Sequence, residues 1–114
     1  ATIWECFIAG LARMGEAVDP PLRSNERGLM FEQNATNQQV LIKLMKENPK
    51  MGLLCELLVD FDEGLQEWRY RHVKMVERTI GTKMGTGGSD GAKYLRATLH
   101  QPIFPDLWAI RTEF

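Results

Sequence analysis

Two histidines occur in the chain, and one of them occupies a position at which an imidazole could bind a metal ion. His72 follows Trp68 by four residues and precedes Val76 by four, so the three side chains share one face of a helix. An imidazole on an apolar face can hydrogen-bond a backbone carbonyl in a core, or it can be the axial ligand of a haem in a helical bundle. Position alone leaves both interpretations open.

Other metal chemistry is less well supported by the spacing of the possible ligands. A zinc site is disfavoured because zinc takes three or four ligands, and no second His or Cys stands at ligand spacing from His72. The absence of a Cys-x-x-Cys-His motif excludes covalent attachment of a c-type haem. His100 lies beside a turn bounded by prolines, where we expect it to be exposed.

A second candidate site is the glycine-rich stretch from residue 85 to residue 91, Gly-Thr-Gly-Gly-Ser-Asp-Gly. It contains no Gly-Lys-Ser/Thr, and its glycine spacing differs from that of a dinucleotide-binding loop. Closely spaced glycines expose backbone N–H groups and let a ligand approach, and Thr86 and Ser89 add hydroxyls. The stretch therefore suits a small anionic or zwitterionic group, although a flexible connector would have the same composition.

The element that must position His72 is a long helix, predicted at residues 50–80. Its apolar stripe, at steps of three and four residues, consists of Leu54, Leu57, Leu58, Phe61, Leu65, Trp68, His72, Met75, Val76 and Ile80. Acidic residues precede basic ones along this helix, which suits the helix dipole and permits i,i+4 ion pairs among Asp60, Asp62, Glu63, Glu67, Arg69, Arg71, Lys74, Arg78 and Lys83. The stripe is too long for the shorter helices of this chain, so we expect a missing N-terminal part or another subunit to cover it.

Shorter helices are predicted on both sides of the long one, which makes the fold all-α. The first follows a Thr2 cap, has a stripe that ends at Met14, and stops at Gly15 and Pro20-Pro21. A loop at 19–36, pinned by Leu29, Met30 and Phe31, leads to a helix at 36–48 that Asn48-Pro49 ends. After the glycine-rich stretch we expect a short helix at 92–99, a turn framed by Pro102 and Pro105, and a last helix at 106–113.

Composition sets the class of protein. The chain has 114 residues, 44% hydrophobic and 25% charged, with a net charge of −1, which fits one globular domain and favours neither nucleic acid nor membrane as a partner. No apolar run approaches the roughly 20 residues of a membrane span, and the start of the chain lacks the basic region of a signal peptide.

Cys6 and Cys55 are expected to be buried free thiols, although a disulfide between them stays possible. Free thiols indicate a reducing compartment, so we expect a cytoplasmic location. The chain also begins without Met, which suggests a fragment, a processed chain or one piece of a split protein.

The sequence from Trp68 to Ser89 resembles the tryptophan 2,3-dioxygenases. In that family a Trp-Arg-x-x-His segment on a long helix is followed, after a fixed gap, by Gly-Thr-Gly-Gly-Ser, and His72 and Thr86 match that gap. The resemblance continues through residues 94–98 and, less closely, through the tail at residues 104–113. It implies an all-α haem-binding bundle of the tryptophan/indoleamine 2,3-dioxygenase type, of which residues 1–114 form one segment from the C-terminal half.

The resemblance also implies chemistry. His72 would be the proximal axial ligand of a haem b iron, and Thr86 would contact the amino-acid end of tryptophan in a substrate site that includes Gly85, Gly87 and Ser89. The family reaction inserts both atoms of O₂ across the indole C2–C3 bond and gives N-formylkynurenine, so this chain needs no general base or nucleophile of its own. Family members are homotetramers, and their distal histidine and substrate-carboxylate arginine lie in an N-terminal half that this chain lacks.

Two departures from the family pattern leave the substrate open. Asp90 stands where the family usually has a second serine, and Ala92-Lys93 replaces an aromatic pair. Tryptophan is the expected substrate, and the alternatives are a homologous enzyme that oxidises another indole and a haem-free helical interaction fragment.

Overall fold

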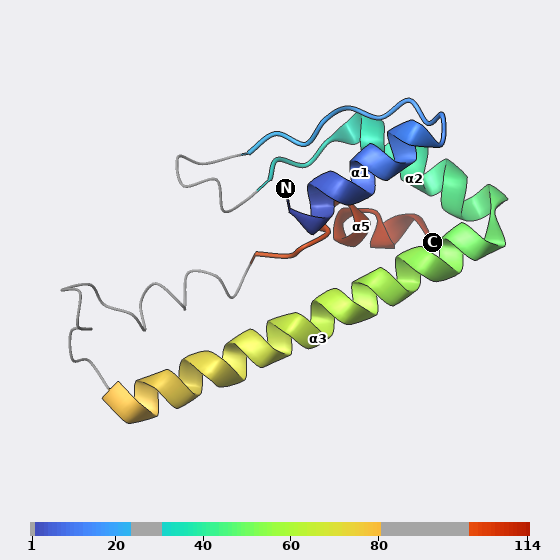
Figure 1. Cartoon of the computed structure of the whole chain (residues 1–114). Helices are drawn as coiled ribbons and strands as arrows, with labels where there is room; N and C mark the ends of the chain where they lie inside the picture. Colours follow the sequence, from blue (N-terminus) through green and yellow to red (C-terminus); the bar gives the residue numbers. More distant parts are fainter. Residues whose placement is uncertain (1, 24–30, 81–100) are drawn as a thin grey trace.

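The structure is a computed structural model that describes residues 2–23, 31–80 and 101–114. Within these ranges every regular element is a helix, as the all-α prediction requires, and the one β-type pairing is an isolated bridge between Arg23 and Phe31. The long helix α3 is a rod, and α1, α2 and α5 gather beside its N-terminal half while its C-terminal half extends away from them (Figure 1). The elements are α1 (Ile3–Arg13), α2 (Ala35–Glu47), α3 (Pro49–Ile80), α5 (Pro105–Ala109) and the 3₁₀ turn η1 (Arg111–Glu113).

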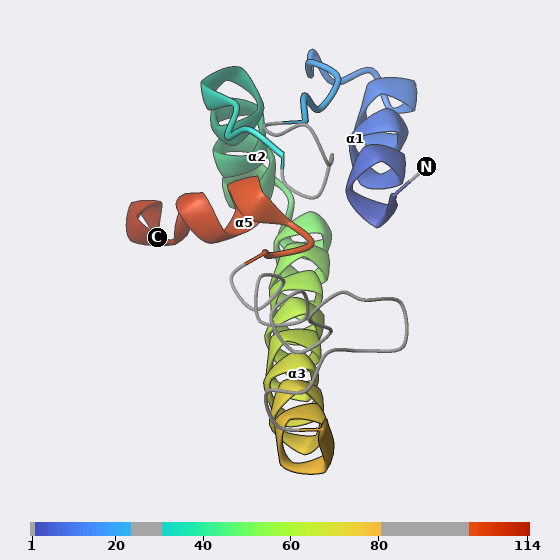
Figure 2. The same ribbon diagram turned by 90° about the vertical axis from the view of Figure 1, so that its left-hand side faces the viewer.

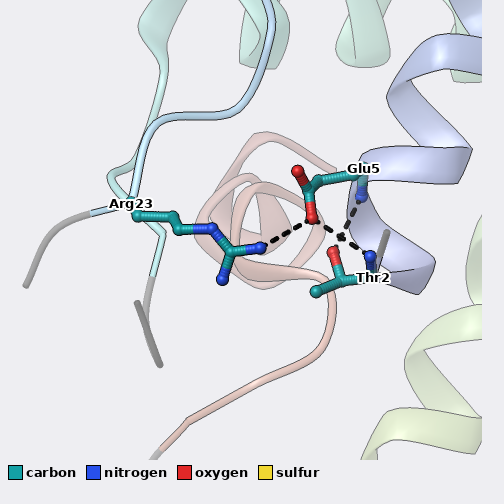
Figure 3. Close-up of polar contacts among 3 residues, drawn as sticks. All are labelled: Thr2, Glu5 and Arg23. Carbon is teal, nitrogen blue, oxygen red and sulfur yellow. Dashed lines mark hydrogen bonds and ion pairs between the residues drawn. The ribbon is translucent and has the colours of Figure 1, made fainter. Parts of the chain in front are cut away.

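Helix α1 begins where the sequence predicts, because Thr2 and Glu5 form a capping box. The Thr2 hydroxyl accepts a hydrogen bond from the Glu5 N–H at 3.2 Å, and the Glu5 carboxylate accepts one from the Thr2 N–H at 3.0 Å (Figure 3). That backbone bond is the main reason that the pKa of the Glu5 carboxyl lies below its usual range. Arg23 pairs with the same carboxylate at 3.0 Å and so ties the chain after α1 back to its first turn.

The bounds of α2 and α3 agree with the prediction within one residue. Asn34 caps α2 by accepting a hydrogen bond from the Asn37 N–H at 2.8 Å, and Asn48 separates the two helices. Phe31 packs against the core as predicted, whereas Leu29 and Met30 lie outside the described residues. The predicted last helix is broken, because Ile110, which is buried in the core, leaves helical geometry between α5 and η1.

The core lies where α1, α2 and α5 meet the first half of α3, and Figure 2 shows the remainder of α3 extending beyond this cluster. Phe104, just before α5, packs edge-on against Trp4 and Phe7 of α1, with 6.1 Å between ring centroids in each pair. The buried apolar side chains of the cluster are Trp4, Ile8, Leu11, Leu41, Met51, Cys55, Val59, Phe104, Leu107 and Ile110.

The apolar stripe of α3 is largely uncovered within the described part of the chain, as the sequence analysis expects, and a different face of the helix packs there. The face that packs within the chain carries Met51, Cys55, Val59, Asp62 and Val73. By contrast, the predicted stripe is 43–59% exposed at Leu54, Leu57, Phe61, Trp68 and Met75. The helix has apolar residues on two faces, and the segment at 101–110 packs on the face that contains Asp62.

The cysteines do not share one environment. Cys55 is a fully buried free thiol, as predicted, but Cys6 is exposed, so the prediction of burial was wrong for it. Cys6 lies on the side of α1 away from Trp4 and Ile8, which face the core. Burial, with a smaller contribution from Glu56, raises the pKa of the Cys55 thiol to about 11.

Candidate functional site

His72 lies in the C-terminal half of α3, beyond the region where α1, α2 and α5 pack. Its imidazole stacks on the indole of Trp68, one turn earlier, with 5.0 Å between ring centroids and 6° between ring planes. The imidazole is half-buried, whereas Trp68 is 59% exposed. The stack therefore fixes the plane of the imidazole without enclosing it, as a ligand of an external group requires.

The surface around this stack is a continuous apolar strip, which we call the His72 face. It consists of Leu54, Leu57, Phe61, Leu65, Trp68, His72 and Met75. Within the described part of the chain, five of these side chains remain about half exposed. Full burial of one large apolar side chain contributes roughly 1.5–3 kcal/mol, so covering the strip would add on the order of 5 kcal/mol. A strip of this size indicates a binding surface.

The neighbouring side of α3, about 80° around the helix from His72, is held by a buried carboxylate that the sequence analysis noted only as one of the acidic residues of the helix. Asp62 is fully buried, and its Oδ2 accepts hydrogen bonds from the Phe104 N–H at 3.0 Å and the Trp108 Nε1–H at 2.9 Å. Its Oδ1 accepts a third bond from the Gln66 side chain at 3.1 Å. A buried charge with three donors is well satisfied. Asp62 therefore fastens residues 101–110, which we call the C-terminal segment, to α3.

Two further contacts extend this attachment along α3 and to α2. Arg69 donates to the backbone carbonyl of Gln101 at 2.6 Å, two turns after Asp62. Asp106, also buried, accepts from the Asn34 N–H at 3.0 Å and from the Gln38 side chain at 2.7 Å, at the start of α2. The C-terminal segment thus packs on a side of α3 that His72 does not occupy, and no described residue range covers the His72 face.

One signal in the sequence could have identified Asp62. The residues Met51, Cys55 and Val59 repeat at steps of four, and Asp62 follows at a step of three on the same face. This second stripe is shorter than the predicted one, but it places a carboxylate in line with buried side chains.

The metal-ligating side chains of the described residues suit a metal ion that is already held by a cofactor. No cluster of three or more His, Cys, Asp or Glu side chains in the described ranges could hold a metal ion. A single imidazole is enough for a haem iron, to which the porphyrin supplies four nitrogens, and the apolar side chains around His72 match the apolar ring. His72 and the His72 face therefore fit a haem.

The predicted substrate-binding residues Gly85, Thr86, Gly87 and Ser89 lie outside the described residues, as do Asp90, His100 and the predicted helix at 92–99. Among the described helices, none combines the length and the apolar character needed to cross a membrane.

Comparison with known proteins resolves the family. The sequence profile described as Tryptophan 2,3-dioxygenase matches residues 13–114, which is most of the chain. This chain belongs to the tryptophan 2,3-dioxygenase family.

Individual tryptophan 2,3-dioxygenases align with nearly the whole chain. That of Herpetosiphon aurantiacus is 48% identical over 112 residues, which cover 98% of this chain and 43% of the relative. That of Anaeromyxobacter sp. strain K is 51% identical over 110 residues, 96% of this chain and 41% of the relative, and that of Bacillus anthracis is 36% identical over 115 residues. These identities confirm the predicted family. The chain spans about two fifths of the length of these curated tryptophan 2,3-dioxygenases.

Proposed function

We propose that this chain supplies the proximal haem-binding wall of a tryptophan 2,3-dioxygenase, with His72 as the axial ligand of the iron. The observation that carries the proposal is the position of His72: it is stacked on Trp68 near the C-terminal end of an apolar face that no described element covers. A histidine that served only to satisfy a core would face the buried side of α3, on which Val73 and Asp62 lie.

Each described residue near His72 has a physical task in this arrangement. Trp68 restricts rotation of the imidazole, which lowers the entropy lost when the imidazole binds iron. Leu65 and Met75, on either side of this stack along α3, would contact the porphyrin and exclude water from the proximal side. The haem, when bound, supplies the iron at which O₂ is activated.

Substrate binding is proposed for the glycine-rich stretch. The hydroxyl of Thr86 would hydrogen-bond the polar end of tryptophan, and the N–H groups of Gly85, Gly87 and Ser89 would assist it. The product proposed from the family is N-formylkynurenine. Asp90, where the family usually has serine, favours a second candidate substrate, an indole without a carboxylate, if its own carboxylate faces the ligand.

The assembly is also part of the proposal. Because the chain spans about two fifths of the relatives' length and its His72 face is open, we infer that an N-terminal half or a companion chain forms the distal wall. Subunits would then associate as a homo-oligomer in the cytoplasm.

Purification of the full-length protein tests the proposed function. We expect a Soret band at one haem per subunit and O₂-dependent conversion of tryptophan to N-formylkynurenine. Turnover of a carboxylate-free indole with no turnover of tryptophan would favour the second substrate. A protein that binds no haem after reconstitution would contradict the proposed function and leave the haem-free helical interaction module as the alternative.

A further inference from the structure

A row of cations borders the His72 face along the C-terminal half of α3. Each helical residue advances by about 100°, so Arg71 and Arg78 lie roughly 100–120° around the helix from His72, on the side of Met75. The groove of about 480 Å³ between these side chains is lined by Tyr70, Arg71, Lys74, Met75, Arg78 and Thr79. A positively charged groove therefore adjoins the proposed haem surface.

The three cations are not equally available for a ligand. The Lys74 ammonium pairs with Glu77 at 3.3 Å and lies 5.6 Å from the centre of the Tyr70 ring. Arg71 and Arg78 are exposed, and neither forms a hydrogen bond or an ion pair with another residue of the described ranges. A guanidinium binds a carboxylate through two parallel hydrogen bonds, so each arginine matches one carboxylate.

The surroundings of the His72 face leave one favourable direction for negative charge. On the opposite border, Arg69 is already bonded to the Gln101 carbonyl and the C-terminal segment covers the helix. On the same side of α3 as Arg71 and Arg78, but closer to the N-terminus of the helix, lie Asp60 and Glu67. Their carboxylates would repel a carboxylate of the ligand. Anionic groups of a ligand on the His72 face would therefore point toward Arg71 and Arg78.

We propose that Arg71 and Arg78 bind the two propionate carboxylates of the haem and so set the in-plane orientation of the porphyrin. This inference rests on the proposed function, because it takes His72 as the axial ligand. Haem has an apolar ring with two carboxylates at one edge. The His72 face offers the matching surface: apolar side chains around the imidazole and two arginines along one border.

The test compares haem with haem dimethyl ester, whose propionates carry no charge, in the full-length protein. Affinity is measured by Soret titration for wild type, Arg71→Gln, Arg78→Gln and the double variant, with Arg13→Gln on α1 as the matched control. Each substitution at the site should weaken haem binding about threefold to tenfold, as for partly exposed charge-assisted pairs. Binding of the ester should be unchanged by any of them, and higher salt should weaken the binding of haem more than that of the ester.

Several results would overturn the inference. Equal losses for haem and ester in the double variant would mean that the arginines support the fold rather than the propionates. If the double variant fails to fold, the test rests on the wild-type protein alone. Equal affinity of the wild-type protein for haem and for haem dimethyl ester would then contradict recognition of the propionates. Unchanged haem affinity in the double variant, while His72→Ala abolishes the Soret band, would reject the inference and leave the proposed function intact. A wild-type protein that binds neither compound would reject both.

Discussion

The carboxylate of Asp62 and the indole of Trp108 are joined by a hydrogen bond of 2.9 Å that spans 46 residues of sequence. The same oxygen also accepts from the Phe104 backbone, so one side chain fixes the C-terminal segment against α3. This attachment lies on the buried side of α3, and among the described residues no element covers the side that carries His72.

Replacing Asp62 should destabilise the fold strongly. Asp62→Ala leaves the Trp108 and Phe104 donors buried without an acceptor, and each such donor costs roughly 1–3 kcal/mol, so we expect a loss of about 3–5 kcal/mol. Urea denaturation followed by tryptophan fluorescence measures the loss. The control is Asp60→Ala, an exposed carboxylate on the same helix, which should change stability by less than about 0.5 kcal/mol. Equal effects of the two substitutions would contradict the structural role of Asp62.

The sequence predicted the helices well because their signals are local. The Thr2–Glu5 capping box, the Asn48-Pro49 boundary and the uninterrupted run to Ile80 all lie within the segments that they define. The resemblance around His72 likewise depends on one short stretch. Each of these signals can be recognised without knowledge of the three-dimensional packing.

The buried face of α3 could not be predicted, because its determinants are distant in sequence. Two sets of apolar residues at helical spacing lie on the first half of the helix, one through Leu54 and Phe61 and a shorter one through Cys55 and Val59. The choice between them depends on donors from residues 104 and 108, which meet Asp62 only in the folded chain. An aspartate beside other acidic residues resembles a solvated charge until those donors are known.

Burial of Cys55 should make the folded chain less stable at alkaline pH. The pKa of this thiol rises from 9.0 to about 11 in the folded chain, so between these values the unfolded chain loses the proton first and is favoured. Stability that is fully present below pH 9 should fall by about 2–3 kcal/mol as the pH approaches 11. Urea denaturation at pH 8, 9, 10 and 11 measures this decline. Cys55→Val, which has no thiol, should lack that part of the decline, and an identical pH profile in the two proteins would contradict burial of the thiol.

The open His72 face should make the isolated chain self-associate. Leu57 and Phe61 are more than half exposed and adjoin one another on α3, so a second copy would cover apolar area that water otherwise contacts. Sedimentation velocity of residues 1–114 should show concentration-dependent association that Phe61→Lys reduces. Glu63→Lys, a change to the same residue type on the charged side of the helix, should not reduce it. A monomer at all concentrations, with sharp and dispersed NMR signals, would argue against an uncovered face.

Thr86 is expected to act on the substrate and not on the haem. Loss of one hydrogen bond to a charged group removes roughly 1.5–3 kcal/mol, so Thr86→Ala should lower kcat/KM for tryptophan about tenfold to a hundredfold with a nearly unchanged Soret band. Steady-state kinetics and the absorption spectrum of the same sample provide both readouts. A haem spectrum that collapses together with activity would show that Thr86 supports the fold.

Asp90 provides a separate test of substrate choice. If its carboxylate faces solvent or pairs with Lys93 or Arg96, Asp90→Ser should leave the preference between tryptophan and a carboxylate-free indole unchanged. We expect this outcome, because an unpaired carboxylate beside a buried ligand is costly. A shift of the ratio of turnover rates toward tryptophan in Asp90→Ser would instead assign Asp90 to substrate selection.

The central claim, that His72 is the haem ligand, is tested most directly by the haem content of full-length variants. The chain has only one other histidine, His100, so His72→Ala and His100→Ala form a matched pair. We predict that His72→Ala retains substoichiometric haem and no dioxygenase turnover, whereas His100→Ala keeps the wild-type Soret spectrum and haem content. Full haem content with an unchanged Soret band in His72→Ala would contradict the assignment.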